Sequence, residues 1–288
     1  MSSVATTPRA PVSRSEAPLH KPKKKMTRFI LPGFTWLMIL YLSLPILVMI
    51  VYSFNAVPAV EPIRQTPKFQ GFTLNWWRDA FGVGGLTDAL KHSLLIAPLS
   101  ALIATIAGTL LGLVLGRYSF RGKGGVNFTI FLAIAVPEIV LGSSLLSLFI
   151  QANVFTIGFQ TILISHIAFS IPFVAVTVRA RVAGLDRSLE DAAQDLFANP
   201  VTAFFKVTLP LIMPGIISGF LLAFVLSLDD FVITNFVSGP FNTFPIWVYG
   251  ATRLGLPPQV NVIGTLLFSA GVIAAIVNVV LQRRRAKA

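Results

Sequence analysis

Three carboxylates lie within apolar segments of the sequence, where ionisable groups are costly. They are Glu138, in the apolar run 128–150, and the adjacent Asp229 and Asp230, in the run 211–236. Charges inside a membrane usually face a bundle interior or an aqueous path. The sequence offers no base at comparable depth, so these anions need water or a passing cation as compensation. The three acids therefore predict a path for a cationic solute.

The adjacent aspartates allow other interpretations. One of them could cap a broken helix or bind a base of a neighbouring subunit, and all three acids could relay protons in a secondary transporter. An intramembrane aspartyl protease needs carboxylates that converge from separate helices, whereas successive residues of one helix point roughly 100° apart. The sequence therefore gives no support for a protease, and it contains no other constellation typical of an enzyme.

Three aromatic residues follow the aspartates and could contribute to the same path. Phe231, Trp247 and Tyr249 carry rings whose faces attract ammonium groups. Aromatic residues at such positions more often pack against lipid or core side chains. We treat the three as candidate path residues, with packing as the alternative role.

The rest of the sequence lacks the residues of common cofactor sites. It contains no cysteine, which excludes a thiol nucleophile and a zinc-thiolate site, and its histidines, His20, His92 and His166, show no metal-ligand spacing. The segment 116–124, GRYSFRGKG, differs from a phosphate-binding loop in two ways. Five residues separate its first two glycines, where such a loop has four, and no Ser or Thr follows its lysine. The chain is predicted to bind no cofactor or metal and to hydrolyse no ATP by itself.

Composition predicts an all-α membrane protein. Hydrophobic residues make up 55% of the chain and charged residues 12%, and the mean hydropathy is +0.78. A helix needs roughly 20 mostly apolar residues to cross about 30 Å of hydrocarbon. Six segments meet this condition: 29–54, 90–115, 128–150, 159–178, 211–236 and 262–281. We therefore expect residues 29–288 to form a six-helix transmembrane domain.

Basic residues predict the orientation of these segments. With both termini in the cytoplasm, 18 of the 23 Lys and Arg residues fall on the inner side. This asymmetry, together with contacts to anionic lipid headgroups, accounts for the net charge of +12 without nucleic acid as a partner. Residues 1–28 are basic and poor in large apolar side chains, so we expect a disordered cytoplasmic tail. A signal peptide is the alternative, but the following apolar run exceeds the usual length of about 7–15 residues.

Glycine spacing predicts close packing of two spans. Gly108, Gly112 and Gly116 fall on one face of the second span, and Gly215 and Gly219 repeat this spacing in the fifth. Helices in lipid associate through small residues that allow close backbone approach. We also expect that prolines within spans can kink the helix, as at Pro45, Pro137 and Pro172.

A charged segment at 179–210, between two apolar runs, carries its own helix signals. Ser188 with Asp191 fits a capping box, and Asp186 is an alternative cap, so a helix should begin near Leu189. Glu190, Asp191 and Asp195 place negative charge in its first turns, where the helix dipole favours it.

A second helix should follow after a sharp bend. Asn199 before Pro200 is expected to stop the first helix and cap the next, over residues 200–207. Leu209-Pro210 and Pro214 would then mark re-entry into the membrane. The alternative is an interfacial amphipathic helix that has no partner.

This segment resembles the cytoplasmic EAA loop of ABC importer permeases. Asp191, Ala192 and Ala193 stand at the Glu-Ala-Ala positions, Phe197 stands at the motif glycine, and Leu209-Pro210 ends the motif. Phe197 is the larger departure, since glycine tolerates a positive φ that phenylalanine does not. Either the bend uses another geometry, at Asn199 for example, or docking has been rebuilt around an aromatic side chain.

The resemblance implies a type I ABC importer permease architecture and a set of partners. The loop would insert into a groove of an ATPase subunit, whose dimer carries ATP and Mg. Small alanines would permit close docking and the acids could meet basic groups. The implied coupling residues are Glu190, Asp191, Ala192, Ala193, Asp195, Phe197, Asn199 and Pro200. A second permease subunit and an extracytoplasmic binding protein complete the implied complex, in a bacterial inner membrane.

Longer strings resemble the second membrane subunit of the spermidine/putrescine permeases. They are LSLDDFVITNFVSGP at 226–240, TFPIWVYGATRLG at 243–255 and VPEIVLGSSLL at 136–146. The resemblance implies polyamine import, which agrees with the cationic solute predicted from the acids. Another cargo, such as iron, thiamine or an anion, is the alternative within this class.

Overall fold

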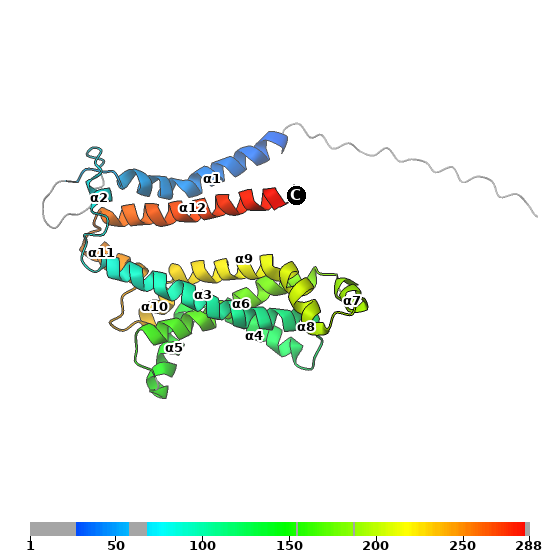
Figure 1. The fold of residues 1–288 in the computed structure, drawn as a ribbon. Helices are drawn as coiled ribbons and strands as arrows, with labels where there is room; N and C mark the ends of the chain where they lie inside the picture. Colours follow the sequence, from blue (N-terminus) through cyan, green and yellow to red (C-terminus); the bar gives the residue numbers. More distant parts are fainter. Residues whose placement is uncertain (1–26, 58–67, 154, 187, 286–288) are drawn as a thin grey trace, which may run out of the picture. The chain divides into compact units, whose positions relative to one another are not determined.

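The computed structural model describes residues 27–57, 68–153, 155–186 and 188–285 (Figure 1). The helices are α1 Thr27–Tyr52, α2 Asn75–Arg78, α3 Leu86–Arg117, α4 Lys123–Ala135, α5 Glu138–Ala152, α6 Phe159–Ala183, α7 Ser188–Asp195, α8 Pro200–Ala203, the π-helical η1 Phe204–Thr208, α9 Leu209–Leu228, α10 Val232–Val237, α11 Phe244–Leu254 and α12 Gln259–Arg285. Within these ranges the helices are accompanied by no strand, and the β-type pairing is an isolated bridge between Asn55 and Phe72, so the all-α prediction is confirmed. The predicted tail, 1–28, lies almost wholly outside the described residues.

The chain divides into a unit of residues 1–49 and a unit of residues 50–288. Helix α1 supplies the described part of the first unit. Its apolar stretch Leu31–Tyr52 is long enough to cross a membrane, and it contains Pro45 without a break in the helix.

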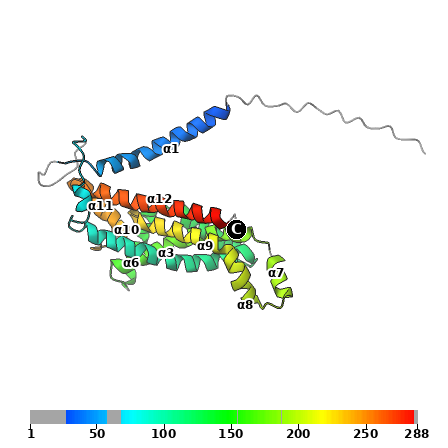
Figure 2. The same cartoon turned by 45° about the horizontal axis from the view of Figure 1, so that its top comes forward.

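Helices α3, α6 and α9 form the core of the second unit and run side by side (Figures 1 and 2). The predicted glycine contacts are present: a Cβ added at Gly112 would lie 2.7 Å from the Ala175 carbonyl oxygen, and one at Gly108 would lie 2.6 Å from Val174 Cβ. On α9, Gly219 also approaches Val174. Because these glycines expose backbone to the neighbouring helix, the three helices approach closely.

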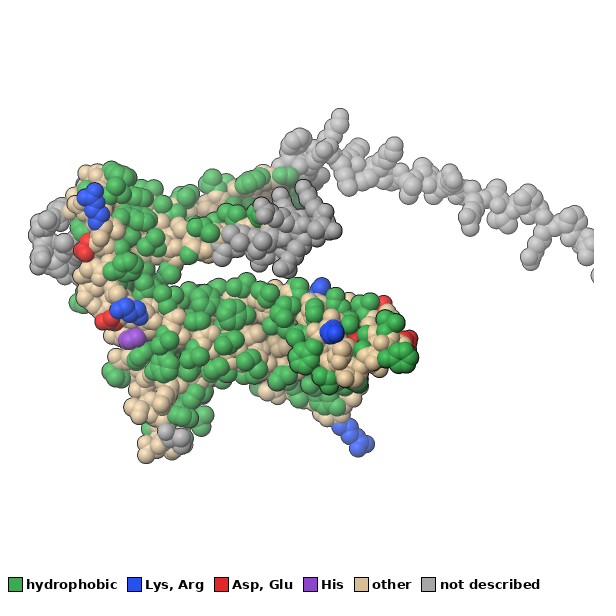
Figure 3. All heavy atoms as spheres, viewed as in Figure 1, with side chains coloured by type: hydrophobic (Ala, Val, Ile, Leu, Met, Phe, Trp, Pro, Cys, Tyr) green, Lys and Arg blue, Asp and Glu red, His purple; other side chains and the backbone are tan. Residues whose placement is uncertain are grey.

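The outer surface of this bundle is apolar along the length of its helices. On α3, Leu102, Ile106 and Leu110 recur every four residues and are exposed. In the view of Figure 3, apolar side chains cover the long helices of this unit, and charged side chains lie near their ends. This distribution suits contact with lipid between two polar boundaries.

The prediction of six spans is only partly correct. Four described helical segments are long and apolar enough to cross a membrane: 31–52, 86–117, 159–183 and 200–228. The kink expected at Pro137 is confirmed and is sharp: the predicted span 128–150 is a pair, α4 and α5, bent by 105° at Val136 and Pro137. Proline lacks a backbone N–H and disfavours helix at the residue before it, which explains this break. Counting the pair as one span gives five.

The predicted span 211–236 is also interrupted. Helix α9 ends at Leu228, the next residue, Asp229, is its C-terminal cap, and α10 begins at Val232. Helix α12 covers the last predicted span, 262–281, and its apolar described part is Gln259–Ile273.

The charged segment forms a bent helical structure, and we call residues 188–203 the elbow. The predicted first helix is confirmed as α7, and Asp186 is its cap, since its Oδ1 accepts from the Ser188 backbone N–H at 3.0 Å. This hydrogen bond lowers the pKa of the Asp186 carboxyl below its ordinary value. Asn199 caps α8 as predicted, because its Oδ1 accepts from the Thr202 backbone N–H at 2.7 Å.

The predicted end of the second helix at Val207 is wrong. Helix continues from Pro200 to Leu228 through the π-helical turn η1, so Leu209-Pro210 marks no break. Pro210 cannot donate a backbone hydrogen bond, and a widened turn directly before it accommodates that loss within a continuous helix.

Candidate functional site

Two of the predicted path acids lie at the breaks of the two interrupted helices. Glu138 is the first residue of α5, directly after the 105° bend, and Asp229 is the C-terminal cap of α9. Their side chains are exposed, and Glu138 is within Coulombic reach of Asp229 and Asp230. The α5 and α10 backbones are close, since a Cβ added at Gly142 would lie 3.3 Å from Ile233 Cα. The fold thus brings acids from sequence positions about 90 residues apart into one region.

Asp230 differs from its neighbour because it is buried and caps α10. Its exposed fraction is 9%. Its Oδ2 accepts from the Thr234 backbone N–H at 2.8 Å and from Thr234 Oγ1 at 2.6 Å. Its Oδ1 accepts from the Ile233 backbone N–H at 3.3 Å. This geometry is the helix-capping alternative considered for one of the two aspartates.

His166 on α6 lies beside Asp230, with Nε2 3.2 Å from Oδ2. The expectation that these acids have no base at comparable depth is therefore wrong for Asp230. His166 Nε2 is also 2.8 Å from Thr234 Oγ1, and its Nδ1 is 2.6 Å from Ser227 Oγ, which accepts from Ser100 Oγ at 2.9 Å. These polar groups connect α3, α6, α9 and α10 in the core.

Sequence reasoning missed His166 as a site residue because its partners lie more than 60 positions away along the chain. One signal was available: an ionisable residue within an apolar span is rare and usually has a partner. For Glu138 and Asp229, no described residue forms an ion pair. These two carboxylates therefore remain open to a cation.

The helix termini reinforce the negative character at Asp229. The last carbonyl groups of a helix carry partial negative charge, and α9 ends immediately before Asp229. Asp230 and Glu138 occupy the opposite kind of terminus, where backbone N–H groups favour an acid. A cation at the α9 terminus would meet both a carboxylate and these carbonyl groups.

The predicted aromatic residues separate into two places. The Phe231 and Tyr249 rings are in contact, with centroids 4.5 Å apart. The Arg253 guanidinium lies over the Tyr249 ring, 4.8 Å from its centroid. Trp247 belongs to a different apolar cluster, with Leu86 and Ile263, next to Gly85. Phe231 directly follows Asp230 in the sequence, and the structure brings Tyr249 against Phe231. Trp247 packs elsewhere.

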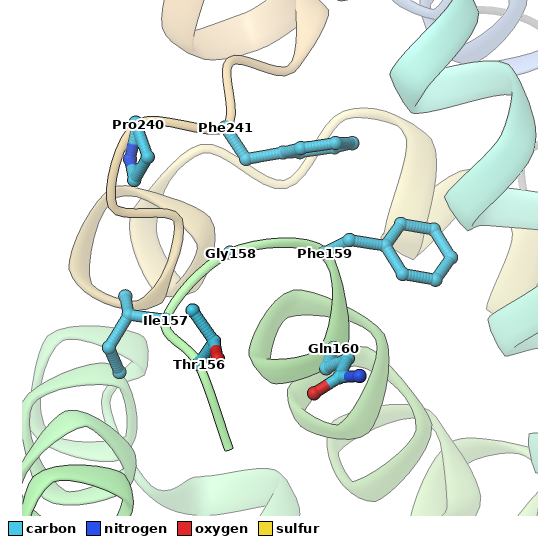
Figure 4. Close-up of a pocket in the computed structure, with 7 residues that line it drawn as sticks. All are labelled: Thr156, Ile157, Gly158, Phe159, Gln160, Pro240 and Phe241. Atoms are coloured by element: carbon cyan, nitrogen blue, oxygen red, sulfur yellow. The ribbon is translucent and has the colours of Figure 1, made fainter.

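A shallow cleft of about 330 Å³ lies between the loop before α6 and the loop after α10 (Figure 4). Its lining comprises Thr156, Ile157, Gly158, Phe159, Gln160, Pro240 and Phe241. The Phe241 ring stacks on His92, with centroids 3.9 Å apart. The lining contains no acid, so the cleft offers nothing that would select a cation.

At the elbow, Phe197 keeps the backbone geometry of the glycine that it replaces. Its φ is 64°, in the left-handed region. The Ala198 N–H bonds to the Ala193 carbonyl and the Phe197 N–H to the Gln194 carbonyl, which is the Schellman arrangement at a helix end. The alternative of another geometry at Asn199 is wrong, because Phe197 itself has the left-handed conformation, while Asn199 is the extended cap of α8, with φ −69° and ψ 159°.

The elbow presents both apolar and acidic side chains at its surface. Phe197 is 99% exposed and Leu196 82%. Asp191, Ala192 and Asp195 are exposed, whereas Ala193 is partly buried. Glu190 points inward instead and pairs with Arg117 at the end of α3. Figure 1 places the elbow at one end of α3, α6 and α9 and the interrupted end of α9 at the other.

No group of three or more His, Asp or Glu side chains in the described ranges is arranged to hold a metal ion. The site is therefore defined by acids at helix breaks and by an exposed elbow at the far end of the same helices. Acids at breaks in membrane helices are typical of the substrate and ion sites of transport proteins.

Comparison with known proteins identifies the class. Residues 108–287 match the family described as binding-protein-dependent transport system inner membrane component, and the chain belongs to this family. It is similar to the spermidine/putrescine transport system permease protein PotC of Escherichia coli K12, with 38% identity over 261 residues, covering 90% of this chain and 96% of that protein. The putrescine transport system permease protein PotI of Escherichia coli K12 is 39% identical over 266 residues, covering 90% of each.

Solved structures show the same fold at low sequence identity. A chain of a bacterial ABC transporter involved in the import of the acidic polysaccharide alginate aligns with a TM-score of 0.62 and 17% identity, covering 93% of this chain and 99% of that chain. A chain of the MetNI methionine ABC transporter, in an inward-facing conformation, aligns with a TM-score of 0.56 and 16% identity, covering 69% and 93%. The fold is that of ABC importer permeases.

Proposed function

We propose that this chain is a permease subunit of an ATP-driven importer whose cargo is a polyamine such as spermidine or putrescine. The observation that carries the proposal is the placement of Glu138 and Asp229 at two helix breaks, where no described base pairs with them. The similarity to PotC and PotI over 90% of the chain supports the same cargo.

Polyamine chemistry suits this arrangement. A polyamine carries several ammonium groups on a flexible apolar chain, so it could pass from one carboxylate to the next. Asp229 and the carbonyl groups at the end of α9 would bind one ammonium group, and Glu138 another. Phe231 and Tyr249 would add cation–π contacts, although Arg253 already occupies one face of Tyr249. Asp230 would act mainly by holding α10 in place.

Energy for transport would come from other subunits. The elbow would dock in a groove of an ATPase dimer that binds ATP and Mg, through Asp191, Ala192, Asp195 and Phe197. A second permease subunit would complete the path, and an extracytoplasmic binding protein would deliver the cargo. In this arrangement the complex lies in a bacterial inner membrane, with both termini of this chain in the cytoplasm.

Reconstitution of the complex in proteoliposomes tests the cargo. Vesicles that contain this chain, its second permease subunit and the ATPase should take up labelled spermidine or putrescine when cargo-loaded binding protein and ATP are supplied. Unlabelled polyamine should compete, and iron, thiamine and inorganic anions should not. Uptake of one of those solutes without polyamine uptake would assign another cargo. Polyamine uptake that persists without any ATPase and follows a proton gradient would indicate a secondary transporter.

A further inference from the structure

Glu190 is the one acid of α7 whose side chain is turned away from the surface. Asp191 and Asp195 on the same helix are exposed, whereas the Glu190 side chain is 20% exposed. The Arg117 side chain opposite it is also 20% exposed. A residue buried within its own chain to this extent offers little of its carboxylate to a docking partner.

The contacts of Glu190 join three elements. Arg117, the last residue of α3, donates from Nη1 to Glu190 Oε2 at 2.7 Å and from Nη2 to Oε1. Thr208, the last residue of η1, donates from Oγ1 to the same Oε1 and lies 3.5 Å from Arg117 Nη2. Two parallel bonds between a guanidinium and a carboxylate fix orientation as well as distance.

Thr208 is only 1% exposed and closes the π-helical turn that precedes α9. Such turns are rare and occur frequently at functional sites. The pair therefore meets α9 at the turn where its helical geometry changes. On the other side it meets α3, which packs on α6 through Gly108 and Gly112.

We propose that Glu190 is a positioning residue, which with Arg117 and Thr208 forms a brace between α7, the end of α3 and the π-helical turn at the start of α9. Motion of α7 is then transmitted to α3 and α9 together and is not lost in movement of the loops around α7. The mechanical role rests on the proposed function, in which an ATPase moves the elbow. The geometric role does not depend on it.

Charge exchange tests the mechanical role in the reconstituted complex. Glu190→Arg and Arg117→Glu should each still bind the ATPase, but uptake per ATP hydrolysed should fall by about tenfold or more. The double variant restores a pair of opposite charge and should recover most of this ratio. Gln194→Arg, alone and with Arg117→Glu, is the matched control, since Gln194 is exposed on the same helix, lies outside the proposed docking residues and should show no recovery. Loss of ATPase binding in Glu190→Arg without recovery in the double variant would show a partner contact and overturn the proposal.

A distance measurement tests the geometric role without any ATPase. The chain has no cysteine, so spin labels can be placed at Gln194→Cys and Arg121→Cys, which are exposed positions on α7 and beyond α3. The distance distribution should be narrow in the parent, broader in Glu190→Arg and in Arg117→Glu, and narrow again in the double variant. A distribution that none of these changes alters would overturn the brace. ATP-independent uptake by the parent complex would instead overturn the proposed function and leave the distance result to decide the brace.

Discussion

Asp229 and Asp230 are neighbours in the sequence but have different surroundings. The Asp229 side chain is exposed at the end of α9, whereas Asp230 is buried and accepts hydrogen bonds from Ile233 and Thr234 beside His166. Because the helix breaks between α9 and α10, the two carboxylates point into different environments. Substitutions at the two positions should therefore have different consequences.

Asp229→Asn should reduce spermidine uptake by about tenfold or more, because one charge-assisted hydrogen bond contributes about 1.5–3 kcal/mol. Thermal stability should hardly change, since the side chain is exposed. Asp230→Asn should instead destabilise the protein by about 1–3 kcal/mol, since a buried hydrogen-bond network is disturbed. Uptake in proteoliposomes and thermal unfolding in detergent measure both effects. Unimpaired polyamine uptake in the double variant would contradict a path through these acids.

Phe197 combines an unfavourable backbone conformation with a fully exposed ring. A non-glycine residue in the left-handed region costs about 1–2 kcal/mol. Phe197→Gly should therefore slow amide hydrogen exchange in α7, while Phe197→Ala, which keeps the Cβ, should not. Both variants should bind the ATPase more weakly if the ring docks in its groove. Equal ATPase affinity of the parent and both variants, measured by titration in detergent, would show that the ring makes no contact.

At the scale of elements, glycine contacts set the spacing of α3, α6 and α9. Gly112→Ala would place a Cβ 2.7 Å from the Ala175 carbonyl oxygen, which is backbone and cannot rotate away. This change should lower stability by about 1–3 kcal/mol. Gly271→Ala on α12 is the control, since its Cβ would meet nothing within 4 Å. Similar thermal unfolding of the two variants would contradict tight packing at Gly112.

The start of α7 should depend on pH through Asp186. Its pKa is lowered by the Ser188 N–H, so its stabilising effect is present above the ordinary value of 3.8 and is lost as pH falls through the lower folded value. Acidification should therefore increase hydrogen exchange near Ser188. Asp186→Asn keeps an acceptor that does not titrate and should remove this pH dependence. Identical pH profiles in the two proteins would assign the effect to another group.

Local signals predicted the helices and their caps better than their breaks. Asn199-Pro200 and the glycines at 108 and 112 act on nearby backbone or on one helix face, so their spacing is sufficient. The interruption after Asp229 lies beside contacts of His166 with Ser227 and Asp230, which only the folded chain brings together. The Arg117–Glu190 pair joins positions 73 residues apart, and no sequence spacing indicates it. The site acids could be predicted from the sequence, because a charged side chain within a membrane span is energetically costly. The proposed path role of Asp229 and the capping role of Asp230 could not be told apart.

At the scale of the whole molecule, the two functional regions lie at opposite ends of the same three helices. The elbow and its brace contact α3 and the start of α9, while the acids lie at the end of α9 and at α5. A displacement at the elbow can thus reach the acids through continuous helices with close backbone contacts. We expect motion of the elbow and exposure of the acids to change together during transport.

The most direct measurement is the position of Ala192 relative to the ATPase subunit during transport. Ala192→Cys introduces a cysteine into a chain that has none, so crosslinks can be assigned to this site. Crosslinks to the ATPase subunit are expected, together with ATP turnover that rises when polyamine-loaded binding protein is added. Crosslinks that place Ala192 on the outer side of the membrane would contradict docking of the elbow on the ATPase. So would uptake that proceeds while Ala192 forms no crosslink to the ATPase subunit.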